Sequence, residues 1–233
     1  MINNDKIEIF NGIALLKEDQ CICRFVRESG RLDHDQNMLP LVLEYIPIGG
    51  VVIDIGAFIG DHTIAYSNKV GNNGAVHAFE PSENAFECLS INSNNIGKFD
   101  NIYSYNCAIG KEQSMVTIET VADNNGMNYI KEGDSVNILP LDLCFGFDKY
   151  KIDFIKIDVE GYELDVLVGG KETINKFKPT MLIEINDMTL ERQGVNRQQI
   201  FDWLTENNYI YRNIYKEQGL NDSQLDIICL PIN

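Results

Sequence analysis

The chain has 233 residues, of which 44% are hydrophobic and 23% are charged. This length and balance predict one folded domain or a closely packed pair, and they exclude a largely disordered chain. Neither a run of about 18 apolar residues nor the basic-then-apolar start of a signal peptide is present, so we expect a cytoplasmic protein outside the membrane. The formal charge of −16, from 35 acidic and 19 basic residues, disfavours binding to nucleic acid and to anionic membranes.

The first 48 residues predict a small N-terminal region. Residues 7–16 are expected to form a β-hairpin, because their central Asn-Gly pair suits the positive φ angles of a tight turn. Residues 35–46 carry apolar side chains at helical spacing. We expect the hairpin and helices of residues 1–48 to cover a cleft in the remaining domain, residues 49–233.

From residue 51 onward, apolar strands alternate with helices. Such alternation predicts right-handed crossovers and a mostly parallel sheet with helices on both faces, which is a doubly wound, Rossmann-like α/β fold. The last two strands are too close in the chain for a crossover helix, so they are expected to pair antiparallel. The polar stretch 122–135 is expected to be a loop. Strands are expected at 51–55, 75–79, 101–107, 114–119, 152–158, 180–185, 209–215 and 225–230, and helices at 61–70, 83–93, 162–168 and 196–207.

The turn after the strand at 51–55 combines an acid with two glycines. Asp54 lies on the strand, and Gly56 and Gly60 allow the backbone to turn sharply and approach a ligand. Glu80 ends the next strand, where its carboxylate can accept hydrogen bonds from both hydroxyls of a ribose. Pro81 fixes the chain directly after it and is expected to border the same ligand. Together these features favour S-adenosylmethionine, whose ammonium and sulfonium groups suit nearby acids.

A nicotinamide dinucleotide is the alternative ligand, because Glu80 also suits its ribose. A dinucleotide site needs G-x-G-x-x-G, whereas this chain has Asp54-x-Gly56-x-x-x-Gly60. A pyrophosphate loop also has no use for the acid on the strand. An NAD-binding oxidoreductase therefore stays as the alternative from another enzyme class.

A second polar cluster follows another buried strand. Lys156, Asp158 and Glu160 alternate along the chain there, and charge in a parallel strand is costly unless it is paired or used. The next strand ends in Glu184 and Asn186. If the two strands are neighbours, Asp158, Glu184 and Asn186 converge, and they could hold Mg²⁺ or Mn²⁺ or act as a base and orienting acceptors. A purely structural Lys156–Asp158 ion pair is the simpler alternative.

Three histidines are weighed as further site residues. His62 follows the glycine turn, so its ring is expected beside the methionine part of the ligand. His34 lies in a polar segment that could cover the cleft, and it is a weaker candidate for a catalytic base. His77 lies inside a strand and is expected to be structural. Asn125 and Asn128 belong to a loop that could touch an acceptor, although solvated surface is the simpler interpretation.

Three strings, D-I-G-A-x-I-G-D-H-T, A-F-E-P and F-I-K-I-D-V-E-G-Y-E, resemble the FkbM family of S-adenosylmethionine-dependent methyltransferases. The resemblance covers about residues 31–190. It implies a class I methyltransferase fold with a seven-stranded sheet, an antiparallel final strand pair, and methyl transfer to oxygen, commonly on sugars or natural products. It also implies the positions of site residues. Asp54, Gly56, Ala57, Gly60 and Thr63 would border the methionine part, Glu80 the ribose, Ala108 and Ile109 the adenine, and Asp158 and Glu160 the transferred methyl group.

The expected function is an S-adenosylmethionine-dependent O-methyltransferase that acts on a hydroxyl of a sugar or glycan. Methyl transfer of this kind is an in-line displacement that needs alignment and an acidic base or a divalent metal. Asp158 is the first candidate for base or metal ligand and Glu184 the second, with Lys156 as an orienting group and Glu160 beside them. A small natural product as acceptor, or a non-catalytic binding module on the same fold, are further alternatives. The oligomeric state is left open.

Overall fold

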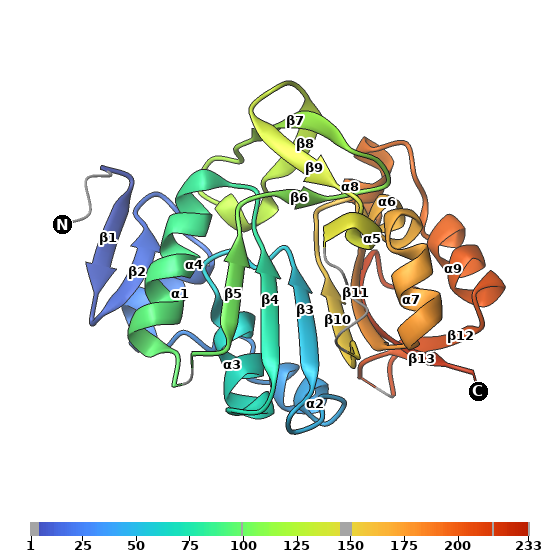
Figure 1. The fold of residues 1–233 in the computed structure, drawn as a ribbon. Coiled ribbons are helices and arrows are strands. Elements are labelled where there is room, and N and C mark those ends of the chain that lie inside the picture. Colours follow the sequence, from blue (N-terminus) through green and yellow to red (C-terminus); the bar gives the residue numbers. More distant parts are fainter. Residues whose placement is uncertain (1–4, 99, 145–150, 216, 233) are drawn as a thin grey trace.

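The computed structural model describes residues 5–98, 100–144, 151–215 and 217–232. Within these residues, the largest element is a sheet of seven strands in the order β12-β13-β11-β10-β3-β4-β5 (Figure 1). β10, β3, β4 and β5 are parallel to one another, whereas β13 runs antiparallel to both β11 and β12. The predicted doubly wound sheet with an antiparallel final pair is therefore confirmed. Its strands are β3 (Val51–Ile55), β4 (Ala75–Phe79), β5 (Ile102–Tyr105), β10 (Phe154–Ile157), β11 (Thr180–Asn186), β12 (Tyr209–Asn213) and β13 (Gln224–Pro231).

Helices cover both faces of this sheet because its central strands are apolar on both sides. In β3, Val52 packs in a core with α2 and α3, whereas Ile53 and Ile55 pack in a second core with α6, α7 and α9. Successive residues of a strand point to opposite faces, so an unbroken β-branched run fills both cores. The helices of the two layers are α2 (Leu39–Leu43), α3 (Asp61–Val70), α4 (Glu83–Ile96), α6 (Glu163–Gly169), α7 (Lys171–Phe177) and α9 (Arg197–Glu206).

The helix expected over residues 35–46 is shorter in the structure. It is present only as α2, and Pro40 lies in its first turn. The proline ring removes a backbone N–H and disfavours helical backbone in the preceding residue, so a helix starts there rather than continuing through it. His34 and Asp35 consequently lie in an irregular segment before α2.

A second sheet occupies part of the stretch that was expected to be a loop. In the described residues its strand order is β6-β9-β7-β8, and Figure 1 shows it beyond the carboxyl ends of β3, β4 and β5. The loop prediction for 122–135 is wrong, because β8 and a short 3₁₀ helix, η1 (Asn125–Met127), lie within it. Ile130 is the one fully buried residue of β8, so the segment lacks the apolar alternation of a strand. The strands are β6 (Ala108–Ile109), β7 (Ser114–Glu119), β8 (Tyr129–Glu132) and β9 (Val136–Leu139).

Four short helices were also not predicted. The start of α7 depends on a distant residue, because the Asp142 carboxylate accepts hydrogen bonds from the backbone N–H groups of Glu172 and Thr173. Such a cap satisfies helix donors without any signal in the neighbouring sequence. No helix in the described part of the chain is both long and apolar enough to cross a lipid bilayer. The four helices are α1 (Ile22–Ser29), α5 (Leu141–Cys144), α7 and α8 (Asp187–Arg192).

The predicted N-terminal hairpin is present as β1 (Ile7–Phe10) and β2 (Ile13–Leu16), with Asn11 and Gly12 at positive φ in its turn. It packs on α4, where the buried Asn92 amide bonds to the backbone N–H and carbonyl of Ala14. The hairpin therefore shares a hydrophobic core with α3 and α4. The division into a cover, residues 1–48, and a catalytic domain, residues 49–233, stays a prediction.

Candidate active site

A cavity of about 420 Å³ lies at the carboxyl ends of β3, β4 and β10. Its walls come from N-terminal residues between 21 and 38, the turns after these strands, and the small sheet with η1. Ligands bind at this end of open α/β sheets, so the cavity is the candidate active site. Predicted site residues in its wall are Gly56, Ala57, His62, Glu80, Pro81, Ala108, Ile109, Lys156, Asp158, Glu160 and Glu184. Asp54, Gly60, Thr63 and Asn186 are predicted site residues that do not line it.

The turn after β3 reaches the cavity because Gly56 adopts a conformation that other residues avoid. Its φ is +83°, and a Cβ at this position would lie 1.8 Å from the carbonyl oxygen of Asp158. The absence of a side chain thus lets the turn touch the segment after β10. Gly60, at φ +92°, does not face the cavity but packs against Leu89 of α4. The two glycines therefore have different tasks, one at the cavity and one at the helix interface.

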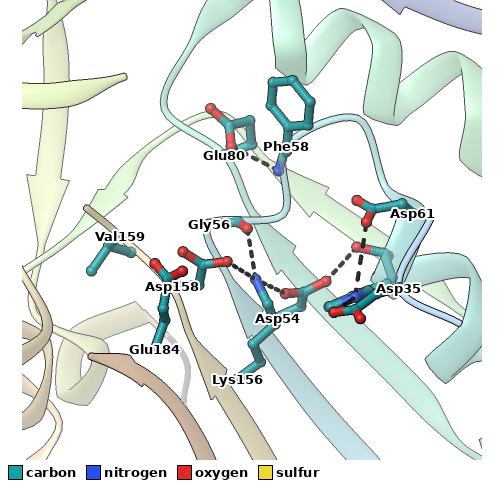
Figure 2. A network of polar contacts seen from close by, with 12 residues as sticks. Asp35, Asp54, Gly56, Phe58, Asp61, Glu80, Lys156, Asp158, Val159 and Glu184 are labelled. Atoms are coloured by element: carbon teal, nitrogen blue, oxygen red, sulfur yellow. Dashed lines mark hydrogen bonds and ion pairs between the residues drawn. The ribbon is translucent and has the colours of Figure 1, made fainter. Parts of the chain in front are cut away.

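Glu80 lies buried in the cavity wall, and backbone donors hold both of its carboxylate oxygens. Oε2 accepts a hydrogen bond of 2.9 Å from the N–H of Phe58 (Figure 2). Oε1 accepts one of 2.7 Å from the N–H of Ser82. Burial raises the pKa of Glu80 to about 7, even though these two bonds favour the charged form. The carboxylate is therefore oriented toward the turn that follows β3, one strand away.

Asp54 lies below the cavity wall rather than in it. The residue is fully buried, its Oδ2 accepts a 2.6 Å hydrogen bond from the Thr63 hydroxyl, and its Oδ1 has no hydrogen-bond partner. The Lys156 ammonium lies 3.7 Å from Oδ1. Asp54 and Thr63 thus form a buried support for Lys156.

Lys156 joins the two motifs that were singled out in the sequence. Its Nζ donates to the carbonyl of Gly56 at 3.1 Å and lies 3.0 Å from Oδ2 of Asp158 (Figure 2). Burial disfavours its charge, but the carboxylates of Asp158 and Asp54 outweigh burial and raise the pKa of Lys156. The ammonium is therefore fixed as a cation between the glycine turn and the segment after β10.

Asp158 and Glu184 influence each other's ionisation. Burial opposes ionisation of Asp158, but the Lys156 ammonium outweighs it and lowers the pKa of Asp158. Burial and the neighbouring Asp158 charge raise the pKa of Glu184 well above its ordinary value. Ionisation of Asp158 therefore disfavours ionisation of Glu184, as expected for two close carboxyl groups.

Glu160 completes a group of three carboxylates. It has a positive φ of 54°, it is 8% exposed, and its Oε2 has no hydrogen-bond partner. Burial, followed by the charges of Asp158 and Glu163, raises the pKa of Glu160 to about 8. Oxygens of Asp158, Glu160 and Glu184 lie within 4.8 Å of one another, close enough to share a cation. Asn186 does not join them, because its Oδ1 caps α8 by accepting from the Met188 N–H.

Two histidines stack at the start of α3. The rings of His34 and His62 are 5.9 Å apart with an interplanar angle of 12°. Nδ1 of His34 lies 2.9 Å from Oδ2 of Asp61, which is buried at the first position of α3. Burial opposes protonation of His34, but Asp61 outweighs it and raises the pKa of His34. Burial also opposes ionisation of Asp61, yet both histidines hold the pKa of Asp61 well below its usual range.

Three acids of the cavity wall were not singled out from the sequence: Asp35, Asp61 and Asp226. Asp226 interrupts the apolar run of β13 and lies opposite Glu184 in the β11–β13 register. Burial, then the charges of Asp158 and Asp35, raises the pKa of Asp226 to about 7. An acidic residue within an otherwise apolar strand could have indicated from the sequence that Asp226 is a site residue. No local signal marks Asp35, whose position depends on how the segment before α2 packs.

One acid connects two walls of the cavity. Asp19 is fully buried, and its Oδ1 accepts from the N–H groups of Cys21 and Cys23 at the start of α1. Its Oδ2 accepts a 2.9 Å hydrogen bond from the N–H of Asn125 in η1. Asn128, also in the wall, uses its Oδ1 to accept from Val121 N–H. The segment at 19–25 and the η1 segment are thereby tied together.

The sheet order and the ligand end of the fold are those of class I methyltransferases, and the sequence match defines the family. The sequence model of the Methyltransferase FkbM domain matches residues 54–211, so the chain belongs to the FkbM methyltransferase family. The hexuronic acid methyltransferase AglP of Haloferax volcanii is 27% identical over 139 residues, which are 58% of this chain and 56% of that protein. The chain thus matches little more than half the length of this curated relative.

Two solved structures are similar in fold. The FkbM methyltransferase from Methylobacillus flagellatus has a TM-score of 0.52 at 17% identity, covering 78% of this chain and 43% of that chain. An S-adenosylmethionine-dependent O-methyltransferase from Thermotoga maritima has a TM-score of 0.55 at 12% identity, covering 94% of this chain and 73% of that chain. At these identities the likeness concerns the fold alone.

Proposed function

We propose that this protein is an S-adenosylmethionine-dependent O-methyltransferase whose acceptor is a hydroxyl of a sugar or glycan. The observation that carries the proposal is the cavity wall in which Glu80 faces the glycine turn and a carboxylate cluster stands on the neighbouring strands. Family membership supports methyl transfer, and the curated relative named for a hexuronic acid supports a sugar.

The donor is proposed to lie along the turns after β3 and β4. Glu80 would accept hydrogen bonds from the ribose hydroxyls with the lone pairs that its two backbone donors leave free. Pro81, Ala108 and Ile109 offer an apolar surface for the adenine. Gly56 and Ala57 would border the methionine part, with His62 at its end. Asp54 and Thr63 would not touch the donor but would hold Lys156 in position. Gly60 would contribute indirectly, because it fixes the start of α3.

The acceptor is proposed to lie on the side of β10 and β11. There the acceptor oxygen must approach the methyl carbon in line with the breaking C–S bond, and holding the two reactants in that geometry is worth up to about 7–11 kcal/mol. Lys156 fixes Asp158 by its 3.0 Å contact. Asp158, Glu160 and Glu184 would orient the acceptor hydroxyls as hydrogen-bond acceptors.

The same three carboxylates fit a divalent cation such as Mg²⁺ or Mn²⁺. Their oxygens lie within 4.8 Å of one another, and Glu160 offers a buried oxygen that has no partner. Hard cations prefer such oxygen ligands. A bound ion would lower the pKa of an acceptor hydroxyl and help to orient it. Asn186, which was expected among the ligands, is not part of the proposed set because it caps α8.

A small or glycan acceptor fits the charge of the cavity better than nucleic acid does. Among the described residues, Lys156 is the only lysine or arginine in the wall, and acids hold it. Polyphosphate backbones need several free cations for binding.

The test combines binding and turnover. Purified protein is titrated calorimetrically with S-adenosylhomocysteine and with NAD, and labelled S-adenosylmethionine is then offered with a panel of p-nitrophenyl hexosides and deoxyhexosides, with EDTA or Mn²⁺. We expect binding of S-adenosylhomocysteine, and methyl transfer to at least one glycoside. Binding of NAD instead would favour the oxidoreductase alternative, and no binding of either would refute the proposal.

A second experiment tests the cation site. Glu160→Gln should weaken Mn²⁺ binding, with the exposed Glu191→Gln as control. Equal Mn²⁺ binding by both variants would show that Glu160 is not a ligand.

A further inference from the structure

The carboxylates of the strand ends are already engaged in this structure. Asp158 contacts Lys156 at 3.0 Å, and Glu184 accepts a hydrogen bond of 2.8 Å from the Gln224 amide. If a cation binds, these groups become its ligands. In both cases Asp158 and Glu184 have other partners, which favours a separate group outside this cluster for removing the proton from an acceptor hydroxyl.

His34 stands apart from that cluster, in the wall contributed by the segment between α1 and α2. Its side chain is 29% exposed, and its ring is held on two sides, by the parallel His62 ring at 5.9 Å and by the edge of Phe25 at 6.4 Å. This residue lies outside the family-matched residues 54–211. The ring is therefore fixed in orientation while it stays accessible from the cavity.

Asp61 determines which ring nitrogen of His34 is free. Its Oδ2 lies 2.9 Å from Nδ1, and its side chain is only 8% exposed. Asp61 is the first residue of the ten-residue helix α3, where the helix dipole stabilises a negative charge. A carboxylate at Nδ1 keeps the proton on that nitrogen and leaves Nε2 as the proton acceptor, and it stabilises the imidazolium once it forms.

We propose that His34 is the general base of the methyl transfer and that Asp61 is its positioning residue. The inference rests on the proposed function. In the step, Nε2 of His34 takes the proton of the acceptor hydroxyl while the acceptor oxygen forms a bond to the methyl carbon of S-adenosylmethionine. The C–S bond breaks, and its electron pair stays on sulfur. The products are the methyl ether, S-adenosylhomocysteine and an imidazolium that releases its proton to water.

The pH dependence follows from the groups that face His34. They are Asp61 and His62 from α3, Asp35 beside it in the chain, and Lys156 from β10. Asp61 and Asp35 favour the imidazolium, whereas Lys156 and burial disfavour it, and the net result is a pKa above the ordinary value of 6.5. A base works when deprotonated, so kcat is expected to rise with pH through a pKa above 6.5.

The test compares three variants on the best glycoside of the panel. His34→Asn should lower kcat by roughly 10²–10⁴-fold and remove the rising limb of the pH profile. The dissociation constant of S-adenosylhomocysteine should stay within about twofold, because the base does not hold the donor. Asp61→Asn should lower kcat less than His34→Asn does. It should also shift the rising part of the pH profile of kcat to lower pH, because the carboxylate that raises the His34 pKa is gone. Imidazole should restore part of the activity of His34→Gly. The matched control is His77→Asn in β4, a histidine that does not line the cavity.

Each other result decides against the proposal. Unchanged kcat in His34→Asn, with an active wild type, would refute the role of His34 and leave the proposed function intact. Weakened binding of S-adenosylhomocysteine with an unchanged pH limb would make His34 a donor-binding residue instead. A wild-type protein that binds S-adenosylhomocysteine but methylates no acceptor, or that does not bind it, would refute the proposed function and this inference with it.

Discussion

The substitution Glu80→Gln tests how burial of the Glu80 carboxyl group, on the proposed donor side of the cavity, makes protein stability depend on pH. The carboxyl group is 6% exposed, and burial raises its pKa from 4.5 to about 7. Because the native state holds the proton more tightly than the unfolded chain, this group makes wild-type stability fall as pH rises from about 4.5 to about 7. At about 1.36 kcal/mol per unit of pKa, the total loss is on the order of 3 kcal/mol.

Glutamine removes this pH dependence while it keeps the shape of the side chain. Protonated Glu80 and its glutamine replacement each offer one good acceptor to the two backbone donors, Phe58 N–H and Ser82 N–H. The two proteins should therefore be similarly stable near pH 4.5, and the variant should gain about 3 kcal/mol on the wild type by pH 7.5. Burial of Glu163 and Asp226 also affects the wild type, but both proteins share those groups and the difference cancels them.

The assay is urea denaturation of wild type and Glu80→Gln at pH values between 4.5 and 8. Glu83→Gln serves as the control, because this neighbouring glutamate is exposed in the first turn of α4 and its loss should cost less than about 1 kcal/mol at all these pH values. S-adenosylhomocysteine should bind the Glu80→Gln protein roughly tenfold more weakly, since a hydrogen bond to a charged acceptor is lost. A pH-independent difference between wild type and variant would refute the assignment of a buried, proton-holding Glu80.

Three further substitutions test the packing around the site. Lys156→Met leaves the fully buried Asp54 and the half-buried Asp158 without their cation, so we expect a loss of about 3–5 kcal/mol in urea denaturation, against less than about 0.5 kcal/mol for the exposed Lys171→Met. Gly56→Ala should cost roughly 2–4 kcal/mol and abolish S-adenosylhomocysteine binding in calorimetry, because its Cβ would lie 1.8 Å from a carbonyl oxygen at a positive φ; an alanine variant with normal binding would contradict the close approach. Asp19→Ala should lose about 1–3 kcal/mol and make the chain near Asn125 faster to cleave in limited proteolysis, and unchanged cleavage would show that this contact does not hold the two walls together.

The main sheet could be predicted because its strands depend on local composition. Continuous β-branched runs such as Val51–Ile55 must be buried on both faces, and the antiparallel final pair follows from the short connection before β13. α7 could not be predicted in the same way, because its first N–H groups are satisfied by Asp142, which lies 30 residues before Glu172 in the chain. β8 was not predicted because only Ile130 supplies a buried apolar side chain.

Some residues of the candidate site could also be predicted from local sequence, and others could not. Glu80, Asp158 and Glu184 could be predicted because each ends or follows a strand that the apolar pattern marks. Asn186 was assigned to a cation because it also ends such a strand, but the adjoining α8 takes its side chain as a cap. Asp35 joins the cavity only through the packing of an irregular segment, which local sequence does not reveal.

The two sides of the cavity come from different parts of the chain, and this matters when members of the family are compared. The proposed donor side is built from the turns after β3 and β4, which lie inside the region that the family model matches, whereas His34 and its neighbours before residue 54 lie outside it. Two proteins can therefore share the whole matched region and still present different groups to the molecule that is modified. If the proposed site is correct, exchange of residues 21–38 between relatives is expected to alter acceptor choice and to leave donor binding unchanged.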